Sequence, residues 1–332
     1  GADNFLYISQ ANNIKVTNNE ISNTYGRAIN IYEPHDLLVD NNHVNTVESG
    51  IGLSVEGYKK SVRKHGKIVI SNNIVENITG GGIYVRALNG SINDVRISDN
   101  KVYNVRKAGI KVTIPDNYPD ARIDNITVSN NYVDKYATEL MEAGITVSDY
   151  NNAQNVSSAI VSGNTVVNGG EHAYYGLRFQ GSKNIIAENN TLQGVFTHSG
   201  IFVEDADNIH LLNNNIDGAC TEKFTIQGGI LLSKPTNCEV ANNTLKNVGG
   251  KENPAYAIHL NKTYSSIINS NIISDSILPY TSYAIYESGV GGISNGSNNI
   301  FKENTYNNEP YLASNNIEYS LLVEELDLGN QN

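Results

Sequence analysis

Acidic residues on either side of an arginine form the first candidate site. Asp149 lies on one segment, Arg178 on a second, and Glu204 and Asp205 on a third. Two carboxyl groups about 5–10 Å apart suit glycoside hydrolysis, one as the acid and the other as base or nucleophile. An arginine between them matches the carboxylate of an acidic sugar. We therefore predict Glu204, Asp205, Asp149 and Arg178 as catalytic residues, provided that the fold brings them together.

Residues that could bind sugar rings lie near these segments. Aromatic faces pack against pyranose rings, and the predicted substrate-binding residues are Tyr84, His172, Tyr175 and Phe202. Isolated histidines elsewhere show no metal-ligand spacing, and no EF-hand pattern occurs. We predict no cofactor, and a Ca²⁺ site of scattered Asp and Glu stays open as an alternative.

The composition excludes several classes of protein. The 332 residues carry 23 Lys and Arg against 34 Asp and Glu, for a net charge of −11. An acidic chain repels phosphate backbones, so we expect no nucleic-acid partner. No apolar run approaches the ~18 residues of a membrane span, so we expect no membrane partner. The two cysteines are too few for a disulfide framework.

A repeated asparagine turn must position the candidate residues. Asn accounts for 51 of the 332 residues, and the second residue of the turn is Asn in eleven copies, 23 to 33 residues apart. These positions are Asn19, Asn42, Asn73, Asn100, Asn131, Asn164, Asn190, Asn214, Asn243, Asn271 and Asn304. Short alternating strands flank each turn, and no stretch has a helical period. Such strands stack as the coils of a solenoid, in which an Asn column hydrogen-bonds from coil to coil.

The strand after each turn opens with a small residue followed by Ile or Leu. The small residues are Ala28, Gly50, Gly82, Gly109, Gly144, Gly176, Gly200, Gly229, Ala257 and Ala284. In this G-I-x-V pattern the Ile and Val point inward, so x and the residue after Val point outward. In the second copy the pattern places Gly52 and Ser54 outward. Long loops flank this strand on both sides, which predicts a walled groove suited to an extended polymer.

These regularities resemble the right-handed parallel β-helix proteins of the pectate-lyase-like superfamily, from residue 5 to about residue 306. The resemblance implies an all-β parallel β-helix of about eleven coils over residues 1–306, with residues 307–332 as a C-terminal cap or tail. Residue 1 lies close to the first coil without a capping helix. We therefore expect a fragment of a longer protein, or an end that another chain covers.

The irregular loops and acidic balance most resemble the β-helical body of phage tailspike depolymerases, which are trimers that degrade capsule or O-antigen. This resemblance implies a polysaccharide partner, a homotrimer, and an extracellular or virion-surface location. The first functional expectation is therefore an enzyme that binds and cleaves an extended, acidic bacterial polysaccharide as a glycoside hydrolase or lyase.

The segment Tyr32-Glu33-Pro34-His35-Asp36 resembles the D-P-H-D/E motif of mannuronan C5-epimerases, in which the His and the acid are catalytic. Glu33 replaces the first Asp of that motif, and Asn30 stands where the family has a tyrosine. Cations further along would neutralise a uronate during proton abstraction. The alternative catalytic set of this epimerase or lyase is Glu33, His35, Arg86 and Lys111. A non-catalytic carbohydrate-binding or adhesion β-helix is the third alternative.

Overall fold

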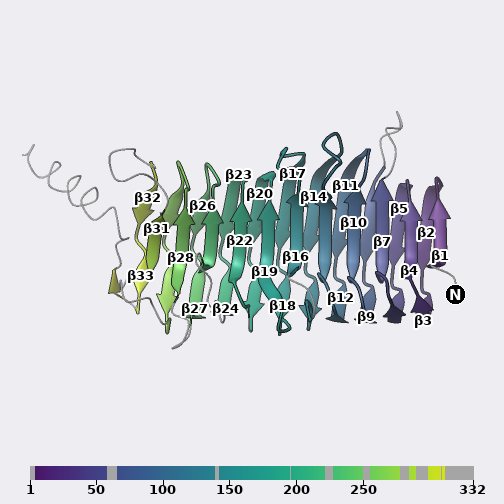
Figure 1. The fold of residues 1–332 in the computed structure, drawn as a ribbon, viewed down its shortest axis with the longest axis horizontal. Coiled ribbons are helices and arrows are strands. Elements are labelled where there is room, and N and C mark those ends of the chain that lie inside the picture. Colours follow the sequence, from purple (N-terminus) through teal and green to yellow (C-terminus); the bar gives the residue numbers. More distant parts are fainter. Residues whose placement is uncertain are drawn as a thin grey trace, which may run out of the picture.

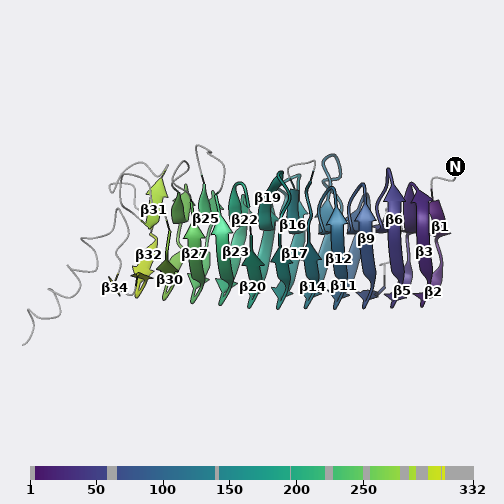
Figure 2. The same cartoon turned by 90° about the horizontal axis from the view of Figure 1, so that it is seen from below.

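The structure, a computed structural model, is a stack of coils along one long axis (Figure 1). Each coil contributes one strand to each of three sheets, which we call sheets A, B and C. The residues that it describes are 4–57, 66–138, 142–194, 196–220, 227–249, 255–276, 284–288, 298–307 and 309–310. The turned view follows the same order of coils from the N-terminal end (Figure 2).

Sheet A contains the strands predicted from the G-I-x-V pattern. Its eleven described strands are β1 (Asn4–Ser9), β4 (Arg27–Tyr32), β7 (Leu53–Gly57), β10 (Ile83–Ala87), β13 (Ile110–Ile114), β16 (Glu142–Asp149), β19 (Ala173–Gln180), β22 (Ser199–Glu204), β25 (Gly228–Ser233), β28 (Tyr256–Asn261) and β31 (Ile285–Ser288). Neighbouring strands of this sheet lie one coil apart and pair in parallel.

Sheets B and C complete each coil. Sheet B consists of β2 (Asn12–Thr17), β5 (His35–Asp40), β8 (Ile68–Ser71), β11 (Ser91–Ser98), β14 (Arg122–Ser129), β17 (Val156–Ser162), β20 (Ser182–Glu188), β23 (Asp207–Leu212), β26 (Glu239–Ala241), β29 (Ile267–Asn269) and β32 (Ile300–Lys302). Sheet C consists of β3 (Glu20–Tyr25), β6 (His43–Glu48), β9 (Ile74–Ile78), β12 (Lys101–Val105), β15 (Tyr132–Asp134), β18 (Thr165–Val167), β21 (Thr191–Gln193), β24 (Asn215–Ala219), β27 (Thr244–Val248), β30 (Ile272–Ser274), β33 (Thr305–Tyr306) and β34 (Glu309–Pro310). The last pair, β33 and β34, is antiparallel. The parallel β-helix expected from the sequence is confirmed.

The asparagine ladder forms at the corner between sheets B and C. Each ladder Asn donates its Nδ2 to the Oδ1 of the Asn one coil further on, at 2.8–3.0 Å from Asn19 through Asn304. The same Nδ2 donates to a backbone carbonyl of the preceding coil, as Asn131 does to Ile97. The residue just before the ladder position takes the left-handed backbone, as Asn130 does with φ of 54°. Asn is well suited to that conformation because its short amide bonds locally.

The small residues at the start of each sheet A strand are required by close packing. A Cβ on Gly82 would lie 2.4 Å from the carbonyl oxygen of Gly109, and one on Gly109 would lie 2.4 Å from Val133 Cγ1. In the second coil the predicted position is wrong. Ile29 pairs with Leu53, so Gly52 takes the place of Ala28, and Gly50 lies in the corner before it. Ser54 and Glu56 are therefore the outward residues of that strand.

The core lies inside the coils and is almost wholly aliphatic. The inward residues of sheet A, such as Ile110 and Val112, are fully buried between coils. Complete burial of one such side chain stabilises the fold by roughly 1.5–3 kcal/mol. Glu287 breaks this inward column and pairs with Leu260, and its carboxylate accepts a hydrogen bond from Asn299.

The described part of the chain consists of strands, turns and loops. Within it, no helix has both the length and the apolar character to cross a membrane. The predicted C-terminal cap or tail over residues 307–332 lies outside the described residues, apart from 307, 309 and 310.

Candidate functional site

The outward face of sheet A carries two columns of side chains one coil apart. The first column is Asn30, Ser54, Tyr84, Lys111, Thr146, Arg178, Phe202, Leu231, His259 and Tyr286. The second column is Tyr32, Glu56, Arg86, Thr113, Ser148, Gln180, Glu204, Ser233, Asn261 and Ser288. Many of these polar residues are as buried as the core, among them Ser54, Thr146 and Ser148. This face is therefore polar but shielded from solvent at many positions, unlike an ordinary exposed surface.

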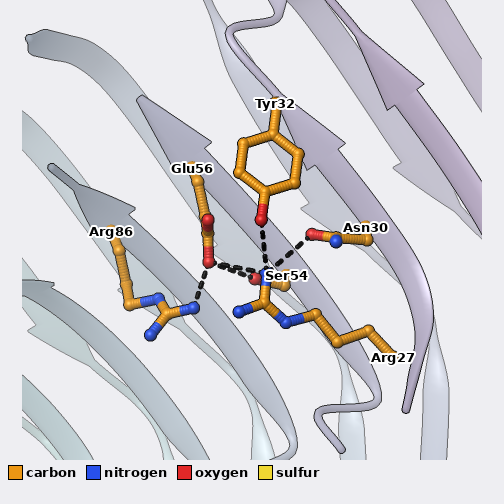
Figure 3. A network of polar contacts seen from close by, with 6 residues as sticks. All are labelled: Arg27, Asn30, Tyr32, Ser54, Glu56 and Arg86. Carbon is orange, nitrogen blue, oxygen red and sulfur yellow. Dashed lines mark hydrogen bonds and ion pairs between the residues drawn. The ribbon is translucent and has the colours of Figure 1, made fainter. Parts of the chain in front are cut away.

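At the N-terminal end of this face, a buried carboxylate lies between two arginines (Figure 3). Glu56 on β7 is 1 % exposed, and its Oε1 lies 2.8 Å from Arg27 Nη1 and in contact with Arg86 Nη2. The same Arg27 nitrogen donates to Asn30 Oδ1 and to the Tyr32 hydroxyl, both at 3.0 Å. A buried charge persists only when paired and hydrogen-bonded, and this network provides both.

In the middle of the face, cations lie over aromatic rings. Lys111 Nζ lies 5.1 Å from the centre of the Tyr150 ring and 3.2 Å from both carboxylate oxygens of Glu142. The guanidinium of Arg178 lies 5.2 Å from the Tyr150 ring and 5.6 Å from the Tyr175 ring. Lys111 is thus already paired with a carboxylate, whereas Arg178 is held by its aromatic contacts and keeps its attraction for an anion.

Arg178 has no carboxylate partner in an ion pair among the described residues. Its Nη2 donates to Gln180 Oε1 at 2.5 Å, and its Nη1 lies 3.5 Å from the Tyr150 hydroxyl. Its buried Nε and the buried Thr146 Oγ1 next to it in the column have no hydrogen-bond partner in the described part of the chain. Buried polar atoms of this kind cost about 1–3 kcal/mol each when left unpaired. The fold therefore keeps unused donors at this point of the face.

A cluster of stacked rings adjoins Arg178. The rings of Tyr175 and Phe202 lie 4.6 Å apart and nearly parallel, at 10°. His198 lies 5.3 Å from Tyr175 and 6.0 Å from Phe202. Burial, together with the nearby His259, lowers the pKa of His198 to about 4, so its imidazole is neutral at physiological pH. Burial likewise raises the pKa of Tyr175 to about 12.

The predicted acids Glu204 and Asp205 lie at the end of β22. Glu204 follows Gln180 in the second column and is half-buried. Burial and then Asp205 raise the pKa of Glu204, while Arg178 and Lys234 act in the opposite direction. Asp205 lies 3.6 Å from Lys234 Nζ. A half-buried carboxyl with a raised pKa has the character of a general acid.

Asp149 and His172 lie in different settings. Asp149 is fully buried, and its two carboxylate oxygens accept from the backbone N–H groups of Asn151 and Asn155 at 2.9 and 3.0 Å. These bonds tie down the loop after β16. His172 is exposed in the turn before β19. Of the central acids, Glu204 shares the outward face of sheet A with Arg178 and Asp205 follows it at the end of the strand, whereas Asp149 is bound by its own loop.

The alternative catalytic residues are divided between two sheets. His35 starts β5 of sheet B and lies 3.0 Å from Asp36, and Glu33 accepts a hydrogen bond from Gln10. Arg86 is held by Glu56, and Lys111 by Glu142. The predicted substrate-binding Tyr84 does lie beside them, with Lys111 5.9 Å from its ring. The cations of this set therefore already have internal partners.

Metal binding finds little support in the described residues. They contain no group of three or more His, Cys, Asp and Glu that could hold a metal ion. The thiols of Cys220 and Cys238 are buried, and burial raises the pKa of each, which disfavours the thiolate that a metal requires.

Sequence reasoning missed Glu56 because it placed the second coil two residues out of register. A charged residue flanked by valine and glycine, in Val55-Glu56-Gly57, was the available signal. Its alignment with Tyr32 and Arg86 becomes visible only when the coils are paired.

Two family models match most of the chain between them. The model described as right handed beta helix region matches residues 3–133, and the model described as periplasmic copper-binding protein (NosD) matches residues 117–321. No curated protein matches the sequence.

Solved structures share the fold at low identity. The periplasmic alginate epimerase AlgG, solved as a mutant, has a TM-score of 0.53 and 12% identity, with 90% of this chain and 76% of that chain covered. The A-module of mannuronan C-5 epimerase AlgE6 of Azotobacter vinelandii has a TM-score of 0.49 and 13% identity, covering 91% and 84%. The Dettilon tailspike protein has a TM-score of 0.48 and 14% identity, covering 83% and 61%. Identities this low show the fold alone.

Proposed function

This chain belongs to the family described as periplasmic copper-binding protein (NosD), and we propose that the outer face of its right-handed β-helix binds and processes an acidic polysaccharide. The polymer would run along sheet A, across successive coils. Repeating sugars meet repeating side chains in this arrangement, because coils stack at the ~4.8 Å spacing of neighbouring strands.

The observation that carries the proposal is the setting of Arg178. Its guanidinium lies over Tyr150 and Tyr175 and lacks an ion-pair carboxylate among the described residues, in a chain of net charge −11. A ligand carboxylate could form charge-assisted hydrogen bonds with this guanidinium, so Arg178 gives an acidic protein a position at which to bind an anion. The parallel rings of Tyr175 and Phe202 beside it offer faces for sugar packing.

Glu204 is the residue proposed to donate a proton to the leaving-group oxygen. Its raised pKa keeps a larger share of the carboxyl protonated than an exposed glutamate has at the same pH. Asp205 is adjacent and lies beside Lys234, a pairing that suits a base or electrostatic role. Asp149 is not part of this proposal, since its oxygens are occupied by backbone donors.

Copper takes no part in the proposed chemistry. The family description names copper, but the described residues do not fit such a site, because their histidines, cysteines and acids form no ligand group. No step is therefore assigned to a metal.

The test is incubation with polyuronates and with acidic capsular polysaccharides. New reducing ends indicate hydrolysis, absorbance of an unsaturated uronate indicates a lyase, and hydrogen exchange without shortening indicates an epimerase. Glu204→Gln should abolish cleavage with binding retained, and the matched control Glu188→Gln on sheet B should have no effect. Loss of activity in His35→Ala but not in Glu204→Gln would favour the epimerase or lyase alternative. Binding without any reaction would leave the adhesion alternative and refute processing.

We further propose a location outside the cytoplasm, either periplasmic or extracellular. The family description and one fold neighbour, the alginate epimerase, both name the periplasm. The predicted homotrimer and virion-surface setting remain proposals, and a light-scattering mass of the intact protein would decide between trimer and monomer.

A further inference from the structure

A depression of about 500 Å³ lies beside sheet A, at the corner where the first coils turn from sheet C into sheet A. Its lining includes Tyr25, Arg27, Ser49, Thr79 and Lys107, together with glycines of three coils. We propose that this corner pocket is a second binding site, which takes one acidic sugar unit through its carboxylate and ring.

Glycines of three successive coils shape the corner pocket. A Cβ on Gly50 would lie 1.4 Å from the carbonyl oxygen of Gly26, and one on Gly80 would lie 1.9 Å from that of Gly50. Gly26 also has a φ of 87°, which L side chains rarely adopt. The backbones of successive coils therefore pack directly against one another here, and no side chain from these positions extends into the depression.

The charge of the lining favours an anion. Arg27 and Lys107 line the corner pocket, and none of its described lining residues is Asp or Glu. A lining with basic and no acidic side chains differs from the composition of the whole chain, which has 34 acidic and 23 basic residues. Arg27 Nη1 is already paired with the Glu56 carboxylate, so Lys107 is the main cation that the pocket offers to a ligand carboxylate.

The remaining lining residues favour a sugar over a bare ion. Tyr25 is 55 % exposed at the corner, so its ring is available for a pyranose face. Ser49 and Thr79 add hydroxyls, although the Thr79 hydroxyl already accepts from the Ser49 backbone N–H and donates to the Val47 carbonyl. The Tyr25 ring, hydroxyl groups and the Lys107 cation match the ring, hydroxyls and carboxylate of a uronate.

Arg27 connects the corner pocket to the face of sheet A. The side chain that lines the pocket also contacts Asn30, Tyr32 and Glu56 on that face through Nη1. The inference thus deepens the proposed function, on which it rests for its ligand class: the pocket would hold a branch or a terminal unit of the same polysaccharide.

The test is a titration with galacturonate followed by saturation-transfer NMR, with neutral galactose as the matched ligand. Lys107→Gln should weaken galacturonate binding at least about fivefold, and Tyr25→Ala should weaken it too. Lys101→Gln, an exposed lysine on β12 of sheet C, is the control and should bind as the wild type does. Equal binding of galactose, equal binding of inorganic sulfate, or an unchanged affinity in Lys107→Gln would overturn the inference.

Arg178→Gln in the same titration separates this inference from the proposed function. If Arg178→Gln abolishes galacturonate binding and Lys107→Gln does not, the corner pocket is refuted and the proposed function stands. If galacturonate binding depends on Lys107 but the polymer fails to bind the face of sheet A, the proposed function is refuted and the corner pocket stands.

Discussion

The N-terminal and central parts of sheet A both carry arginines, but the arginines differ in whether a carboxylate neutralises them. Near the N-terminus, Arg27 and Arg86 share the buried carboxylate of Glu56. In the centre, Arg178 lies over two tyrosine rings and is bonded to Gln180, with no ion-pair carboxylate among the described residues. A cation that is already neutralised gains little from a ligand, whereas one held on aromatic faces keeps its attraction for an anion.

The comparison separates stability from binding. The Glu56 network joins three neighbouring coils through strands β4, β7 and β10, so it stabilises their stacking. In the Arg178 region, the guanidinium lies over tyrosine rings instead of against a carboxylate, a setting that stability alone does not explain. We therefore expect substitutions in the two regions to affect different measurements.

The largest effect is expected for Glu56→Gln. This change leaves two arginines facing each other around a neutral amide, and removal of one partner from a buried ion pair costs about 3 kcal/mol or more. The urea midpoint of unfolding should fall accordingly. The control is Glu76→Gln, because Glu76 pairs with His43 at 2.7 Å but is 29% exposed. Equal decreases in the urea midpoint of the two variants would contradict the conclusion that burial makes the Glu56 ion pairs more important for stability.

The second-largest effect is a pH dependence of the stability, which we expect from His198 in the central region. Its folded pKa of about 4 lies below the ordinary value of 6.5, so the unfolded chain binds the proton first. Its contribution to stability is thus complete above pH 6.5 and is lost as pH falls toward 4, by about 2–3 kcal/mol.

His198→Gln removes this titration while keeping a polar side chain of similar size. Unfolding of wild type and variant by urea at pH 7 and at pH 4 gives the measurement. The stability difference between the two proteins should shift by that amount in favour of the variant at pH 4. A difference that does not change with pH would show that His198 does not titrate as the burial implies.

Arg178→Gln should lower affinity for an acidic polysaccharide about tenfold, because one charge-assisted interaction contributes about 1.5 kcal/mol. The unfolding midpoint should change little. Arg86→Gln is the matched variant in the N-terminal region, and we expect the reverse pattern there, with lower stability and nearly unchanged affinity. Similar affinity losses in both variants, measured by calorimetric titration, would remove the contrast between the regions.

The smallest effect concerns Glu204. Its folded pKa is raised, so the folded protein holds this proton more tightly than the unfolded chain does. The stability it contributes is present below the unfolded pKa of about 4.3 and is lost as pH rises through the folded pKa. Glu204→Gln should therefore gain slightly on wild type between pH 4 and 7, opposite in direction to the His198 effect. A variant that loses stability with rising pH relative to wild type would have the wrong sign.

The repeat made much of the fold predictable. The spacing of Asn73, Asn100 and their equivalents predicts an asparagine ladder, and the hydrogen bonds between successive coils confirm it. The inward position of Ile110 and Val112 followed from strand alternation. The second coil failed because Gly50-Ile51 and Gly52-Leu53 both fit the pattern, and only the pairing of Ile29 with Leu53 distinguishes them.

The candidate site was less predictable. Arg178 and Glu204 were placed on one face correctly, since column membership depends only on register. The sequence does not reveal that both carboxylate oxygens of Asp149 are occupied. They accept hydrogen bonds from backbone N–H groups of the loop that follows it, and these bonds depend on the loop conformation. The partners of Arg86 and Lys111 also depend on side-chain directions across coils.

By itself, the sequence determined a stack of β-coils with an asparagine ladder, because a repeat period and the alternation of side chains are local properties that every coil obeys. Only the tertiary structure decided which charges are paired. Ion pairs such as that of Glu56 with Arg27 and Arg86 join residues about 30 positions apart. A shift of two residues in one coil changes these pairs while leaving the hydrophobic alternation intact.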